Sequence, residues 1–169
     1  LERENLAVGV VSGICGIERN TVTLHGKTGH AGTVPMQGRR DALVPAARII
    51  VEAQNEAMKL ENLRATTGTL SILPGAVNQI PESVSFSLEI RSPNDAVRNG
   101  FRSHVVDYAN RVAAEQGCRI TVDRDHIRSK PFWNKKCVHT IDVCHMCCGM
   151  SAENARPINM IHVLYRMAV

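Results

Sequence analysis

The stretch SVSFSLEIR, residues 83–91, alternates polar and apolar side chains without a break. Its apolar positions are Val84, Phe86, Leu88 and Ile90, and its polar positions are Ser83, Ser85, Ser87, Glu89 and Arg91. Successive side chains of a β-strand point to opposite faces of the sheet. The pattern therefore predicts a strand with one buried face and one polar face.

The segments on both sides of this strand predict the rest of the fold. Residues 20–25, 66–73 and 118–123 are predicted strands, and apolar residues at helical spacing predict helices over residues 39–60 and 95–116. The expected stripes are Leu43, Ala46, Ala47, Ile50 and Ala53 for the first helix, and Val97, Phe101, Val105, Tyr108 and Val112 for the second. Inward-facing residues of the strand over residues 66–73 would be Leu70 and Ile72.

The order strand, helix, strand, strand, helix, strand is that of a ferredoxin-like βαββαβ sandwich, an α+β fold. Each helix has a single apolar stripe, so both helices should cover one face of a four-stranded antiparallel sheet. The open face would then carry Thr21, Thr23, His25, Ser85, Ser87, Glu89 and Arg91. A face this polar can meet water, a partner or a substrate.

Composition excludes several classes of protein. The chain has 169 residues, of which 44% are hydrophobic, and a net charge of +4, which fits one domain with pieces of another. Basic residues do not form a block with interleaved aromatics, so we expect no nucleic-acid partner. The longest apolar stretch, residues 6–17, is interrupted by glycines and too short for a membrane span. Clustered cysteines without a disulfide framework favour an intracellular, cytoplasmic setting.

Residues 1–17 and 131–169 lie outside the six-element unit, which is predicted to span residues 18–130. We interpret both ends as stubs of a neighbouring domain, the second with a helix over residues 135–149. This helix contains CVHTIDVCHMCC, residues 137–148, whose cysteines and histidines are potential zinc ligands. The second half of a paired-ligand site is missing, and cysteine also buries as a small hydrophobe. An alternative hypothesis is that the chain is a metal-binding regulator, which would require zinc bound to these cysteines and histidines.

Three polar residues invite a functional reading. His30 lies in the glycine-rich segment GKTGHAGTVPM, residues 26–36, Asn78 lies in PGAVNQIP, and Arg91 ends a strand. His30 and Asn78 are either ordinary turn residues or groups that the turns present to a ligand. Arg91 is either solvated or placed to hold a carboxylate with two parallel hydrogen bonds. Residue patterns alone do not complete an active site in this chain.

The motifs GKTGHAGTVPMQGRRDAL, LPGAVNQIP and SFSLEIRS occur in this order and spacing. Together they resemble the dimerisation (lid) domain of the M20 metal-dependent amidohydrolases, in the branch of N-carbamoyl-L-amino-acid hydrolases and allantoate amidohydrolases. The resemblance covers about residues 5–155. It implies a catalytic domain interrupted by this lid, and a homodimer in which the two lids form one extended sheet.

The resemblance also implies roles for the three residues. His30 would reach the partner subunit's active site and stabilise the oxyanion, while Asn78 and Arg91 would bind the substrate carboxylate. Two divalent metal ions, Zn or Mn, would sit in the catalytic domain, and none of their ligands matches a residue of this chain. We therefore expect the parent protein to hydrolyse linear amide or carbamoyl (ureido) C–N bonds, and this chain alone to bind no metal and to be inactive. The alternative is a truncated dimerisation or binding module without catalysis.

Overall fold

The computed structural model describes residues 10–11, 14–129 and 157–158. The chain divides into two compact units, one of which is Gly16–Arg128. The other contains the parallel strand pair β1 (Val10–Val11) and β7 (Pro157–Ile158). The predicted helix over residues 135–149, with its cysteines and histidines, lies outside the described residues.

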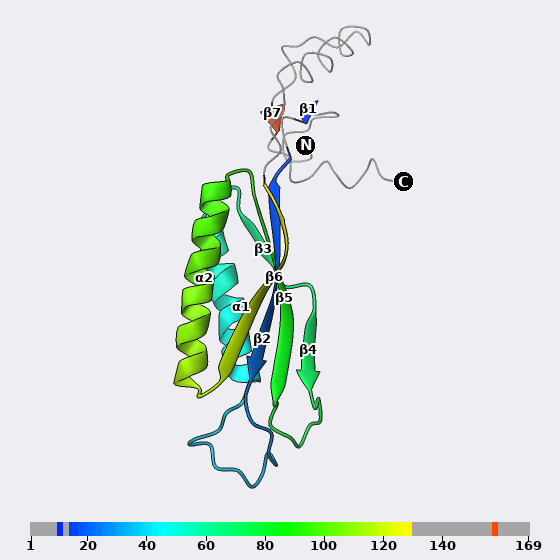
Figure 1. Ribbon diagram of the computed structural model, residues 1–169, viewed down its shortest axis with the longest axis vertical. Coiled ribbons are helices and arrows are strands. Elements are labelled where there is room, and N and C mark those ends of the chain that lie inside the picture. Colours follow the sequence, from blue (N-terminus) through cyan, green and yellow to red (C-terminus); the bar gives the residue numbers. More distant parts are fainter. Residues whose placement is uncertain (1–9, 12–13, 130–156, 159–169) are drawn as a thin grey trace, which may run out of the picture. The chain divides into compact units, whose positions relative to one another are not determined.

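The unit Gly16–Arg128 is an antiparallel sheet covered on one face by two helices (Figure 1). Its elements are β2 (Gly16–His25), α1 (Leu43–Met58), β3 (Arg64–Thr66), β4 (Leu70–Leu73), β5 (Ser83–Ser92), α2 (Asp95–Glu115) and β6 (Arg119–Arg128). The strand order is β3–β5–β2–β6, and β4 pairs with β5 along the same edge as β3. This arrangement confirms the predicted α+β fold with both helices on one face.

The sheet has five strands rather than the expected four, because the strand predicted over residues 66–73 is split. The chain leaves the ladder between β3 and β4, where the Ser87 hydroxyl oxygen accepts hydrogen bonds from the backbone N–H groups of Gly68 and Thr69, both at 3.1 Å. Leu70 lies opposite the buried Phe86 in the pairing of β4 with β5, so it is on the predicted face of the sheet, but at this edge it is 49% exposed. Ile72 is partly buried, as expected.

Polar side chains accept hydrogen bonds from backbone N–H groups at the start of both helices. Asn94 caps α2 by accepting from the N–H groups of Ala96 and Val97, and Gly117, at φ 60°, follows its end. α1 begins at Leu43, four residues later than predicted, after the Asp41 carboxylate accepts from the Leu43 N–H at 2.9 Å. Of the predicted stripe of α1, Ala47 is exposed, and Ile49 is buried instead.

The core lies between the sheet and the helices. Its fully buried apolar residues include Val22, Leu24, Ile49, Val84, Phe86, Leu88, Ile90, Phe101, Val105 and Val112. Every apolar position of the stretch that predicted the fold is therefore in this core. The opposite face of β2 and β5 carries the expected polar side chains.

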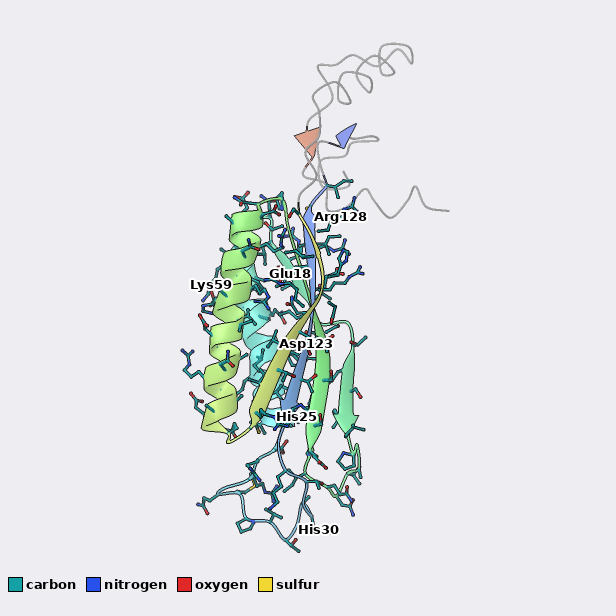
Figure 2. All side chains as sticks on the ribbon, in the orientation of Figure 1. Glu18, His25, His30, Lys59, Asp123 and Arg128 are labelled. Carbon is teal, nitrogen blue, oxygen red and sulfur yellow. The ribbon has the colours of Figure 1, made fainter. Side chains whose placement is uncertain are left out.

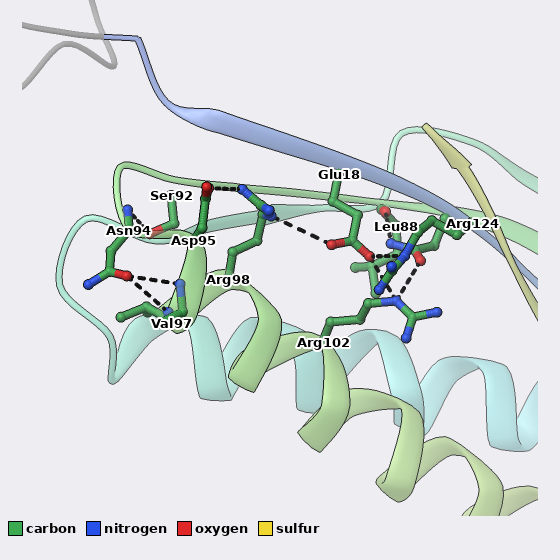
Figure 3. Close-up of polar contacts among 11 residues, drawn as sticks. Glu18, Leu88, Ser92, Asn94, Asp95, Val97, Arg98, Arg102 and Arg124 are labelled. Atoms are coloured by element: carbon green, nitrogen blue, oxygen red, sulfur yellow. Dashed lines mark hydrogen bonds and ion pairs between the residues drawn. The ribbon is translucent and has the colours of Figure 1, made fainter. Parts of the chain in front are cut away.

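β2 begins four residues earlier than predicted. The prediction missed this part of the strand because two polar residues, Glu18 and Asn20, occupy buried positions in its alternation. Glu18 is 0% exposed and lies within ion-pair distance of three arginines, shown in Figure 3. The distances to Glu18 oxygens are 2.8 Å from Arg102 Nε, 3.0 Å from Arg124 Nε and 3.5 Å from Arg98 Nε. Charge pairing therefore compensates the burial of this carboxylate.

Substituting Glu18→Gln should destabilise the fold strongly, because it leaves the buried Arg98 and the partly buried Arg102 without the carboxylate between them. Removing one member of a buried ion pair typically costs about 3 kcal/mol or more in the free energy of unfolding. Urea denaturation of the chain measures this change. The control Glu115→Gln, which breaks only an exposed pair with Arg48, should have little effect. Equal unfolding midpoints for Glu18→Gln and the parent chain would contradict the role of Glu18.

Candidate functional site

The segment between β2 and α1 carries His30 and is anchored at its base by two backbone hydrogen bonds. The Gly26 N–H donates to the Glu82 carbonyl, and the Lys27 N–H donates to the Arg40 carbonyl, both at 2.7 Å. A Cβ atom on Gly26 would lie 2.0 Å from the Arg40 carbonyl oxygen. Glycine is therefore required here by close backbone contact.

His30 and Asn78 lie on neighbouring backbone segments at one end of the sheet. His30 forms an isolated antiparallel bridge with Gln79. The Ala31 N–H donates to the Asn78 carbonyl at 2.9 Å, and the Ile80 N–H donates to the Gly29 carbonyl at 2.8 Å. Both predicted site residues are exposed. Figure 2 shows His30 at the end of the unit opposite to Arg128.

The His30 ring is held by its own loop. Its Nδ1 atom accepts a hydrogen bond from the Gly32 N–H at 3.1 Å. An Nδ1 that accepts carries no proton, so the proton of the neutral ring is on Nε2. His30 is thereby prepared to donate a hydrogen bond from Nε2. A Cβ atom on Gly32 would lie 3.3 Å from His30 Cε1, so a side chain there would crowd the ring.

Arg39 braces the same loop, although it was not among the residues predicted from sequence. Its Nη2 atom donates to the carbonyls of Ala31 and Val34, both at 2.6 Å, and its Nε atom donates to the carbonyls of Val34 and Pro35 at 3.1 and 3.2 Å. The sequence feature that could have indicated this role is the position of Arg39. An arginine, with five N–H donors, directly follows a glycine- and proline-rich loop whose backbone carbonyls need hydrogen-bond donors.

Arg91 lies far from His30 and Asn78. It is eight positions along β5 from Ser83, which corresponds to about 26 Å at the rise of a strand. Its partners in the sheet are Ile17 on β2 and Arg64 on β3. The structure therefore brings two of the three predicted site residues together and places the third near the other end of the sheet.

Arg91 is held by Glu89 on the open face of the sheet. The Arg91 Nε atom donates to one carboxylate oxygen of Glu89 at 2.6 Å, and the Arg19 Nε atom donates to the other at 2.7 Å. Partial burial acts to raise the pKa of Glu89, but hydrogen bonds from Arg91 and Arg19 outweigh it and lower that pKa below its ordinary value. Glu89 is thus a stable anion between two cations.

A hollow of about 320 Å³ opens beside this group. It is lined by residues that include Arg19, Thr66, Gly68, Ser87, Glu89 and Asp125. Asp125 is fixed by the Thr21 hydroxyl, which donates to its carboxylate at 2.6 Å. The open face is therefore hollowed beside the break between β3 and β4, and charged side chains lie at the border of this hollow.

The fold and the arrangement of these loops have a match among known proteins. The family model described as a peptidase dimerisation domain matches residues 12–117. The chain belongs to the M20 dimerisation-domain family. This finding confirms the family resemblance carried by the three motifs.

Relatives of this dimerisation domain include two groups of curated amidohydrolases. The chain is 36% identical over 124 residues to the N-carbamoyl-L-amino-acid amidohydrolase of Paenarthrobacter aurescens, covering 73% of the chain and 30% of that protein. It is 35% identical over 132 residues to the allantoate amidohydrolase of Bacillus subtilis, covering 78% and 32%. The chain thus spans about a third of the length of these relatives.

A solved structure agrees with this assignment. A hydantoinase/carbamoylase family amidase from Burkholderia vietnamiensis superposes with a TM-score of 0.87 at 29% identity, over 94% of this chain and 38% of that one. The shared part again corresponds to a minor portion of the known protein.

The described part of the dimerisation domain does not fit a two-metal centre. Within it, Glu52, Glu56 and His104 are the group whose ligand atoms lie within 4.8 Å of one another. Glu56 is paired with Lys59, and His104 Nε2 lies 3.0 Å from Glu52. Three side chains on two helices supply too few ligands for two ions. In the same described residues, no helix is long and apolar enough to cross a membrane.

Substituting Arg39→Met should loosen the loop around His30 and leave the sheet intact. Hydrogen bonds to a charged group are typically worth about 1.5–3 kcal/mol, so amide exchange at Ala31 and Val34 should accelerate about tenfold or more. Hydrogen-exchange mass spectrometry or NMR of the chain measures this effect. Arg40→Met is the matched control, because the described hydrogen bonds do not involve the Arg40 side chain. Unchanged exchange in Arg39→Met would show that Arg39 does not brace the loop.

Proposed function

We propose that this chain is the lid of an enzyme that hydrolyses a linear amide or carbamoyl (ureido) C–N bond in a small substrate bearing a carboxylate. The names of the relatives, N-carbamoyl-L-amino-acid amidohydrolase and allantoate amidohydrolase, support this reaction class. The observation that carries the proposal is His30, an exposed imidazole whose Nε2 proton is available on a braced loop.

His30 stabilises the oxyanion in this proposal. Attack on the scissile carbonyl moves negative charge onto its oxygen, and a donor already in place lowers the energy of that state. The Gly32 N–H fixes the tautomer, and Arg39 with the backbone bonds to residues 78–80 fixes the loop. The imidazole therefore reorganises little as charge develops.

Asn78 and Arg91 bind the substrate carboxylate, and their separation determines how the site is assembled. The length of β5 keeps Arg91 about 26 Å from Ser83 and thus away from the loop end that carries Asn78. One substrate cannot contact both residues of the same chain. We infer that Arg91 of one subunit acts together with the partner's Asn78 and the partner's His30.

The edge formed by β3 and β4 is the surface that we propose for pairing of the two lids. β4 lies at the edge of the sheet with Leu70 and Leu73 exposed, and such an edge readily pairs with another strand. The neighbouring helix α1, which packs against β3, exposes Val44, Val51 and Met58 seven residues apart. These apolar side chains form one stripe along the helix, of the kind that a partner covers.

A two-fold axis at this edge produces the required arrangement. Antiparallel pairing of β4 with the partner's β4 reverses the direction of the second sheet. The loop end of one lid then lies alongside the half of the other sheet that carries Arg91. Two equivalent sites result, each with residues from both subunits.

Substituting His30→Ala in the full-length dimeric enzyme should lower kcat by about a hundredfold or more, the usual loss on removal of an oxyanion donor. Metal content should stay unchanged, because His30 is not a metal ligand in this proposal. Turnover of N-carbamoyl amino acids and allantoate, with metal analysis of the same samples, measures both quantities. His104→Ala, on the helix side of the lid, is the control. Near-normal turnover of His30→Ala would refute the proposed role.

A further inference from the structure

Glu89 lies on the open face of β5 and has no role in the proposed reaction itself. It lies directly opposite Arg19 in the register of β2 and β5, and two residues before Arg91 on the same face of β5. Its two carboxylate oxygens are engaged separately, one by Arg91 Nε at 2.6 Å and one by Arg19 Nε at 2.7 Å. The Glu89 side chain is also less exposed than either arginine, at 25% against 41% for Arg91 and 57% for Arg19.

This contact determines which part of Arg91 remains available. A guanidinium has five N–H donors, one on Nε and four on the terminal Nη atoms. Glu89 takes the Nε donor, and among the described residues the Arg91 Nη atoms make no hydrogen bond. Their paired N–H groups are the fork that binds a carboxylate with two parallel hydrogen bonds.

The surroundings of Arg91 explain why an anion is needed beside it. Arg64 lies directly opposite Arg91 in the pairing of β3 with β5. Like charges directly opposite each other destabilise a sheet and drive flexible side chains apart. Arg91 has long rotatable side-chain bonds, so without a fixed partner its guanidinium would sample many orientations.

We propose that Glu89 is a positioning residue that orients Arg91 toward the substrate carboxylate. This inference rests on the proposed function and deepens it. Glu89 with its two arginines carries one net positive charge. Glu89 therefore leaves positive charge at this point of the face for a substrate carboxylate.

The test measures kcat and KM of the full-length dimeric enzyme with an N-carbamoyl amino acid. Glu89→Gln keeps the shape of the side chain and removes its charge. KM should rise about tenfold, the effect of one lost charge-assisted contact, while kcat changes much less, as expected for a residue that supports substrate binding.

Glu89→Asp keeps the charge but withdraws it by one methylene, and should raise KM by a smaller factor. Glu61→Gln, an exposed substitution of the same type, is the control and should leave KM unchanged.

A double-mutant cycle separates positioning from a general structural role. In an Arg91→Met background, Glu89→Gln should cause no further rise in KM, because the residue that it orients is gone. A rise of the same factor in both backgrounds would overturn the inference, as would an unchanged KM for Glu89→Gln beside a raised KM for Arg91→Met. If Arg91→Met itself leaves KM unchanged, the carboxylate role in the proposed function fails, and the role of Glu89 fails with it.

Discussion

The rest of the structure depends on the uninterrupted register between β2 and β5. These two strands pair over ten residues, from Gly16 opposite Ser92 to His25 opposite Ser83. The pairing sets which side chains meet on each face, and it also sets the distance between the ends of the sheet. The loop with His30 follows one end of β2, whereas Arg91 lies near the opposite end of β5. A strand is too stiff to shorten, so a site that needs both residues requires two chains.

The two ends of the sheet are held by different kinds of interaction. At the loop end, backbone carbonyls accept from backbone N–H groups and from Arg39, so the conformation depends on glycines and on neutral hydrogen-bond acceptors. At the other end, carboxylates and guanidinium groups dominate on both faces. Glu18 lies among arginines on the buried face, and Glu89 lies between arginines on the open face. The alternation of β2 separates these two charge clusters, since Glu18 and Arg19 are consecutive residues.

The fold was predictable where side-chain polarity and burial agree. The alternation over residues 83–91 placed Val84, Phe86, Leu88 and Ile90 in the core correctly. The start of β2 was missed because Glu18 and Asn20 are polar residues at buried positions, and their compensating partners come from α2, β5 and β6. The break between β3 and β4 depends on the hydroxyl of Ser87 on the paired strand β5, which no pattern within residues 66–73 encodes. The contact between the segments of His30 and Asn78 likewise joins residues far apart in sequence, and no local pattern encodes it. The roles of His30, Asn78 and Arg91 were predicted from family motifs and stay predictions.

Subunit complementation tests the proposed shared site most directly. Homodimers of the full-length enzyme with His30→Ala are mixed with homodimers with Arg91→Met, and the subunits are allowed to exchange. In a mixed dimer, one site combines an intact Arg91 with the partner's intact His30, while the other site lacks both. Random exchange makes half of the dimers mixed, so activity should recover to about a quarter of that of the unsubstituted enzyme. If His30 and Arg91 of one chain served the same site, exchange would restore no activity beyond that of the two separate variants.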